Sequence, residues 1–93
     1  MQLYAILRRS AWDSADALQA AAAESSRVAD EEMDNRVRWI RSYVLDEEDG
    51  TLGTVCIYQA IDEDAITEHA GRADLPVDQI VPIADTVIVR DDP

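Results

Sequence analysis

The sequence has one cysteine and one histidine, eight basic residues against 20 acidic ones, and no long hydrophobic run. One cysteine cannot form an intramolecular disulfide, which favours a reducing compartment. No apolar stretch reaches the length of a membrane span. The opening "MQLYAILRRS" places its short apolar run before its arginines, the reverse of a secretory signal. We therefore expect a cytoplasmic protein that does not enter a membrane.

The charge is equally one-sided, with a formal net charge of −12 at pH 7. Such a field repels phosphate backbones and anionic lipid headgroups, so nucleic acid and membrane surfaces are excluded as expected partners. It favours solubility and could attract cations or basic partners. The length of 93 residues predicts a single domain over 1–93 with one core.

Recognisable catalytic motifs are absent as well. The sequence contains no phosphate-binding loop, no nucleophile elbow and no paired-cysteine metal site. The acidic segment "DEEDGT" at 46–51 lacks the alternating ligand spacing of a calcium loop and is typical of a solvated hairpin tip. No motif therefore decides whether the protein is an enzyme.

Hydrophobic periodicity predicts the element order βαββαβ. Strands are expected at 2–8, 37–45, 52–60 and 79–90. One helix is expected within 11–33, with Asp13 or Ser14 as its N-cap, and a second from an N-cap at Asp62 to the breaker at 74–76. This order is the split βαβ of a ferredoxin-like α+β sandwich. Right-handed crossovers place both helices on one face of a four-stranded antiparallel sheet and leave the other face open.

Alternation along the strands sorts their side chains into two sets. One set is small and mostly aliphatic, and we expect it beneath the alanine-rich helices: Leu3, Ala5, Leu7, Ile40, Ser42, Val44, Val55 and Ile57. The other set is rich in aromatic residues, and we expect it on the open face: Tyr4, Ile6, Arg8, Trp39, Arg41, Tyr43, Cys56 and Tyr58.

An open aromatic face is seldom left in water by a monomer of this size. Either a second copy covers it, giving a homodimer of the dimeric α+β barrel type, or it encloses a ligand cavity, and both can hold at once. The candidate ligand-binding residues are Tyr4, Trp39, Arg41, Tyr43, Cys56, Tyr58 and His69. Arg41 needs an acidic partner, an aromatic plane or an anionic ligand, so it is either a cross-dimer ion pair or the ligand's anchor.

Two further residues have a structural and a chemical interpretation. His69 lies on the apolar stripe of the second helix, either as a half-buried side chain capped by a carbonyl or water, or as a general base or metal ligand. Cys56 has apolar neighbours, which favours a small buried hydrophobe over a reactive thiolate. No catalytic residue is assigned, and His69 and Cys56 are only weak candidates for metal ligands.

Three stretches give the chain a family resemblance: "WIRSYV" at 39–44, "GTVCIYQAIDEDAITEHA" at 53–70 and "LPVDQIVPI" at 75–83. Their pattern is an aromatic strand, a cysteine in the third strand, a capped helix with a histidine near its end, then proline and an isoleucine-rich strand. It resembles a family of small bacterial proteins of unknown function that includes a nickel-binding actinobacterial member. The resemblance implies a ferredoxin-like fold and dimerisation.

Nickel prefers imidazole nitrogen and thiolate sulfur, and each copy of this chain has one of each. The nickel-binding member is rich in histidine near its first strand, where this chain has "LRR" at 7–9. We therefore expect no cofactor, and weak binding of nickel or another divalent metal at most. The leading hypothesis is a homodimeric protein that holds a small organic ligand or a metal ion in an aromatic cavity. The alternatives are a cofactor-free enzyme, resembling monooxygenases or isomerases, and a structural or regulatory partner protein.

Overall fold

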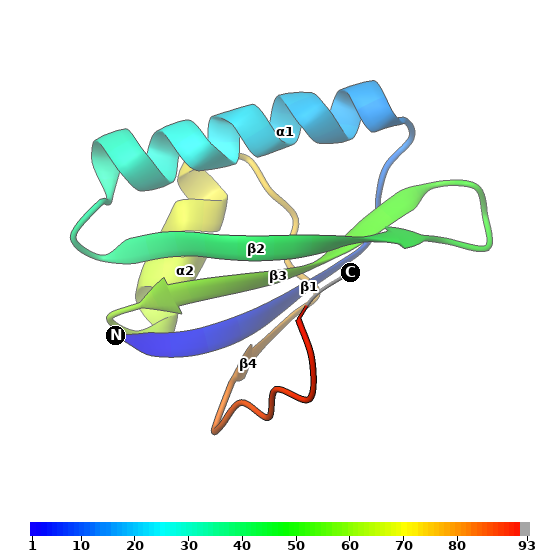
Figure 1. Cartoon of the computed structure of the whole chain (residues 1–93). Coiled ribbons are helices and arrows are strands. Elements are labelled where there is room, and N and C mark those ends of the chain that lie inside the picture. The colour runs from blue at the N-terminus through cyan, green and yellow to red at the C-terminus, as the bar shows by residue number, and fades with distance from the viewer. Residues whose placement is uncertain (92–93) are drawn as a thin grey trace.

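The computed structural model describes residues 1–91 (Figure 1). In chain order its elements are β1 (Gln2–Trp12), α1 (Ala15–Arg27), the π-helical segment η1 (Val28–Glu32), β2 (Val37–Asp46), β3 (Leu52–Ala60), α2 (Glu63–Arg72) and β4 (Gln79–Pro82). The strands form one antiparallel sheet in the order β2-β3-β1-β4. The predicted ferredoxin-like α+β fold is confirmed. Within residues 1–91, no helix is both long and apolar enough to span a membrane.

Both helices begin at the caps that the sequence indicates. The Ser14 side chain accepts a hydrogen bond from the backbone N–H of Ala17 at 3.1 Å, and Asp62 accepts one from Ala65 at 2.8 Å. These bonds satisfy backbone donors that have no partner within the first turn of a helix. The first helix starts later than the start of the expected 11–33 segment, because β1 continues to Trp12, where it pairs with Leu52.

In β1 and β3 the two sets of strand side chains face the opposite way from the sequence-based expectation. Tyr4, Ile6 and Tyr58 are buried beneath the helices, with exposed fractions of 8%, 0% and 1%. They pack in one core with residues of η1 and α2, including Val28 and Ile66. The face assignment of Tyr4, Cys56 and Tyr58 was therefore wrong. Alternation shows which side chains share a face, but it does not show which face the helices cover.

A β-bulge in β2 separates residues that simple alternation places together. Trp39 pairs with Tyr58, whereas Arg41 pairs with Ile57, so Ile40 is one extra residue in the ladder. An extra residue reverses the direction of every side chain beyond it. Trp39 consequently joins the helix-covered face, while Arg41 and Tyr43 stay on the open face.

The last strand is shorter than expected. The sequence indicated a strand over 79–90, but β4 spans only Gln79–Pro82, at the edge of the sheet beside β1. Proline has no N–H for a ladder, which confines it to edges and strand ends. After β4, the Ile83 N–H still donates to the Leu3 carbonyl of β1 at 2.9 Å. Beyond Ile83 the chain leaves the sheet on the side opposite to α1 (Figure 1). Residues 92–93 of the expected tail lie outside the described residues.

Candidate functional site

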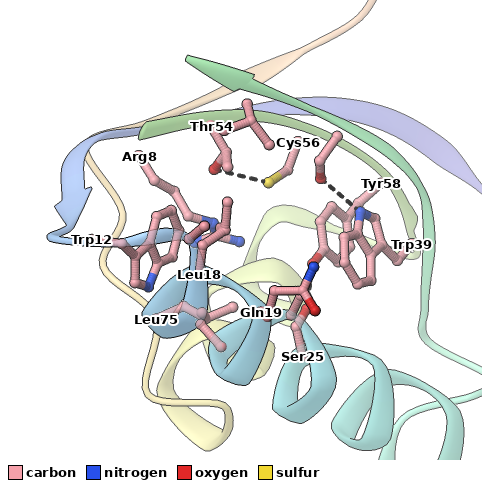
Figure 2. A pocket seen from close by; sticks show the side chains of 15 residues that line it. Arg8, Trp12, Leu18, Gln19, Ser25, Trp39, Thr54, Cys56, Tyr58 and Leu75 are labelled. Atoms are coloured by element: carbon pink, nitrogen blue, oxygen red, sulfur yellow. Dashed lines mark hydrogen bonds between the residues drawn. The ribbon is translucent and has the colours of Figure 1, made fainter. Parts of the chain in front are cut away.

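A cavity of about 410 Å³ lies between α1 and the sheet (Figure 2). On the helix side its wall is made largely of short side chains, including Ala15, Ala21 and Ala22, with Leu18 and Gln19 as larger exceptions. Alanine reaches only one carbon beyond the backbone, so an alanine-rich helix does not fill the space above a sheet of larger residues. In Figure 2, Trp12 and Trp39 lie toward opposite sides of this space.

Arg8 is the main polar group of the cavity wall on β1. Its exposed fraction is 1%, and it is the largest fully buried side chain of the described chain. Its Nη1 donates to the Pro76 carbonyl at 2.7 Å, whereas its buried Nη2 has no hydrogen-bond partner among residues 1–91. The guanidinium is a cation, so this is a buried positive charge.

Tyr58 connects three elements at one end of the cavity. Its hydroxyl and the Ser25 hydroxyl of α1 are 2.7 Å apart in a hydrogen bond. Burial raises the pKa of Tyr58 to about 12, against the opposing effects of the Ser25 hydroxyl and of the nearby Arg8 guanidinium. The phenol is therefore neutral at physiological pH. The Trp39 ring stacks on Tyr58 with centroids 6.0 Å apart and planes inclined by 8°.

His69 lies behind Tyr58, outside the cavity lining. Its ring is fully buried, 5.2 Å from the Tyr58 ring centroid, and its Nε2 is 3.0 Å from the Ser25 carbonyl oxygen. A carbonyl can only accept, so Nε2 carries the proton and Nδ1 is a bare acceptor with no partner among residues 1–91. Burial lowers the pKa of His69, and the Arg8 charge lowers it further, against the Ser25 carbonyl. The geometry corresponds to the carbonyl-capped alternative, although the side chain is fully rather than half buried.

The remaining polar groups on the sheet side satisfy one another. The Cys56 thiol donates to the Thr54 hydroxyl at 3.2 Å, and the Trp39 indole N–H donates to the Ser42 hydroxyl at 2.8 Å (Figure 2). Cys56 is buried, with an exposed fraction of 5%. Arg8 Nη2 is therefore the cavity's unpartnered buried donor within the described residues.

The seven candidate residues do not form one site. Trp39, Cys56 and Tyr58 line the cavity beneath α1, whereas Tyr4 is buried in the core and His69 packs behind Tyr58. Arg41 and Tyr43 line a separate groove of about 700 Å³ between the open face and the segment 83–91. Their distance from the aromatic cluster follows from the bulge at Ile40.

Sequence reasoning also missed several cavity residues. These are Arg8, Trp12, Leu18, Gln19, Ser25 and Leu75. The signal for Arg8 was present, because it alternates in phase with Tyr4 and Ile6 on the aromatic face of β1. The contributions of α1 had no comparable signal, since the helix's alanines do not distinguish its buried face.

A metal site does not assemble from the expected residues. Across residues 1–91, no three histidine, cysteine, aspartate or glutamate side chains come together as ligands. His69 is engaged through Nε2 with Ser25, and Cys56 is engaged with Thr54. A single chain therefore does not offer the nitrogen and sulfur donors that nickel prefers.

The comparisons with known proteins agree with this fold. The crystal structure of SCO4226 from Streptomyces coelicolor A3(2) is similar, with 15% sequence identity, 91% of this chain and 99% of that chain covered, and a TM-score of 0.71. At this identity the likeness shows the fold alone. No curated protein matches the chain. A family model described as "Nickel responsive protein SCO4226-like" matches residues 4–83, which confirms the predicted resemblance. The chain therefore belongs to the SCO4226-like family of nickel responsive proteins.

Proposed function

We propose that the protein is a binding module that holds a small organic molecule in the cavity beneath α1. The observation that carries this proposal is the cavity itself, about 410 Å³ in volume, with apolar walls around a buried Arg8 donor. Ligand sites of soluble proteins are concave, mostly apolar, and contain a few converging polar groups within about 300–1,000 Å³. The groove on the open face is a poorer candidate, because Tyr43 and Val87, which line it, are 45% and 87% exposed.

The family description names nickel, which supports metal binding as a coarse property of the family. In this chain the arrangement of His69 and Cys56 favours an organic ligand over a metal ion as the occupant of the cavity. We further propose a homodimer through the open face of the sheet, acting in the cytoplasm. Support for the dimer comes from Val87, Ile88 and Val89, whose exposed fractions are 87%, 77% and 81%.

The test of the cavity uses a neutral apolar dye and one cavity-filling substitution. N-phenyl-1-naphthylamine should bind the wild-type protein with a rise in fluorescence, and Ala22→Leu should abolish that rise. Ala22 lines the cavity, and leucine adds three carbons inside it. Because those carbons leave water, Ala22→Leu should also raise the free energy of unfolding by about 1–2 kcal/mol.

The matched control is Ala23→Leu, one residue along the same helix at an exposed position outside the cavity lining. It should leave the dye's affinity unchanged. The proposal fails if the wild-type protein does not bind the dye. It fails equally if Ala22→Leu folds and binds the dye as well as the wild type does.

A further inference from the structure

We infer that the ligand of this cavity is an organic carboxylate with a flat apolar body, and that Arg8 binds its carboxylate. This inference rests on the proposed function and specifies the chemical class of the ligand. It depends on three observations: the isolation of the Arg8 charge, the geometry of its free donor and the character of the cavity walls.

The first observation is that Arg8 lacks an anionic partner among residues 1–91, whereas four other arginines of the chain form ion pairs. Arg9 pairs with Glu47, Arg27 with Glu24, Arg36 with Glu68, and Arg72 with Glu32. Among residues 1–91, Arg8 makes no ion pair, although the chain has 20 acidic residues to supply one. A buried unpaired charge costs several kcal/mol. An anion that enters the cavity would offset that cost.

The second observation concerns the direction and number of the free donors. Arg8 extends from β1 toward α1, and its guanidinium lies beside Leu18 in Figure 2. One edge of the guanidinium is held by the Pro76 carbonyl, which leaves Nη2 for the ligand. The Tyr58 hydroxyl and the Thr54 hydroxyl already have partners. A single free cationic donor suits a monoanionic carboxylate better than a phosphate, which needs several donors.

The third observation is the apolar character of the surrounding wall. Leu18, Ala22 and Leu75 present only hydrocarbon to the cavity, and the Trp39 ring adds an aromatic surface. A ligand that satisfied Arg8 alone would leave these surfaces in contact with water. The complementary molecule therefore has a carboxylate at one end and a flat hydrocarbon or aromatic body at the other.

The experiment compares 2-naphthoate with 2-naphthamide, two probes of the same shape that differ in charge. Calorimetry should show naphthoate binding to the wild-type protein at least tenfold more tightly than naphthamide. Arg8→Met keeps the length of the side chain and removes its donors. It should weaken naphthoate binding by ten- to a hundredfold, the range of a charge-assisted hydrogen bond, and should weaken naphthamide binding by a smaller factor, because the amide carbonyl can accept from Arg8 but carries no charge.

Arg9→Met is the matched control, because Arg9 is the neighbouring arginine, is largely exposed and is absent from the cavity lining. It should leave both affinities unchanged. Naphthamide binding to Arg8→Met also reports that the variant is folded. If that variant does not fold, the comparison of the two probes on the wild-type protein still decides the inference.

The possible failures are distinguishable. If both probes bind the wild-type protein equally, or naphthamide binds more tightly, the carboxylate inference is overturned while the cavity-binding function stands. The same conclusion follows if folded Arg8→Met binds naphthoate normally. If neither probe nor the neutral dye binds, the proposed function itself is wrong.

Discussion

Arg8 and Arg9 are consecutive residues of the same type with opposite environments. Arg9 makes two hydrogen bonds to the Glu47 carboxylate, at 2.8 and 3.1 Å, and its side chain is 57% exposed. Arg8 is fully buried and lacks an anionic partner among the described residues. Strand geometry alone causes the difference, because adjacent side chains point to opposite faces. Between these two arginines, only Arg8 is in a position to recognise a ligand inside the fold.

His69 makes the stability of the fold dependent on pH near neutrality. The fold lowers the pKa of this side chain by burial, so the unfolded chain takes up a proton at a higher pH than the folded one. The contribution of neutral His69 to the free energy of unfolding is then fully present above the ordinary histidine pKa of about 6.5. That contribution is lost as the pH falls below this value. Urea denaturation should show the free energy of unfolding falling between pH 7.5 and 5.5, by at most about 1.4 kcal/mol per pH unit.

The control for that slope is His69→Gln, whose amide N–H can still donate to the Ser25 carbonyl. It should make the free energy of unfolding nearly independent of pH over the same range. The hydrogen bond from Arg36 lowers the pKa of Glu68 to about 2, so this carboxylate does not titrate in that range. Equal slopes in the two proteins would contradict this assignment.

Nickel binding is a second residue-scale prediction, since it depends on one histidine and one cysteine per chain. We expect nickel to bind weakly at most, because Nε2 of His69 is occupied and the ring is fully buried. Calorimetry with nickel should give no submicromolar affinity. A submicromolar site that disappears in His69→Ala would overturn this expectation.

At the scale of elements, two irregularities in the strands determine the site. The bulge at Ile40 moves Trp39 to the helix-covered face. The second lies between Arg8 and Trp12, where β1 carries more residues than β3 does opposite and Ser10 adopts a positive φ of 47°. This irregularity lets β1 run on to Trp12, which lines the cavity together with Arg8.

The irregularity between Arg8 and Trp12 of β1 requires a glycine opposite it on β3, at position 53. A Cβ at this position would lie 2.6 Å from the Arg8 carbonyl oxygen and 3.2 Å from Arg9 Cα, both of them backbone atoms. Backbone cannot move aside as a side-chain end can, so Gly53→Ala should lower the free energy of unfolding by about 1–3 kcal/mol. Because the displaced strand carries Arg8, binding of 2-naphthoate should weaken as well. Thermal unfolding and calorimetry measure the two effects.

Gly71→Ala is the matched control, because a Cβ there meets no atom within 4 Å apart from the adjoining backbone of its own helix. Gly71 lies within α2, where alanine has the higher helix propensity. This substitution should raise the free energy of unfolding by about 0.5–1 kcal/mol. If Gly53→Ala proved as well tolerated as Gly71→Ala, the close approach of the strands at Arg8 would have to be wrong.

At the scale of the whole molecule, charge and apolar exposure oppose each other. The net charge of −12 repels a second copy, whereas Val87, Ile88 and Val89 beside the open face would gain from being covered. Apolar burial does not weaken with salt, while charge repulsion beyond about 10 Å is largely screened at 0.1 M. Self-association should therefore tighten as the salt concentration rises.

We expect sedimentation to show a homodimer at micromolar concentration. Its dissociation constant should fall as the salt concentration rises from about 0.02 to about 0.5 M, because salt shortens the distance over which the charges of the two copies repel each other. The double substitution Val87→Ser and Val89→Ser should shift the protein toward monomer without lowering its stability, because both side chains are already exposed in the isolated chain. Ile61→Ser, at an exposed apolar residue 53% accessible before α2, should leave the dimer intact. A wild-type monomer at all salt concentrations would contradict the dimer.

The sequence by itself determined the order of the elements, the two helix caps and the family. Ser14 and Asp62 are recognisable because capping is a local interaction between a side chain and a backbone N–H three residues later. The strands are recognisable because alternation is local too. The same alternation grouped Tyr4 and Ile6 on one side of β1, and the structure keeps them together.

Only the tertiary structure decided which face of the sheet the helices cover. Both faces of these strands are apolar enough to be buried, so the choice depends on how whole surfaces pack and not on any one residue. The bulge at Ile40 was equally hidden, since an extra residue appears only when β2 is aligned with β3. The cavity follows from both, because it exists where the short alanines of α1 meet the sheet around Arg8. The volume of a cavity depends on how two packed surfaces fit together, so it cannot be predicted from the sequence of either segment alone.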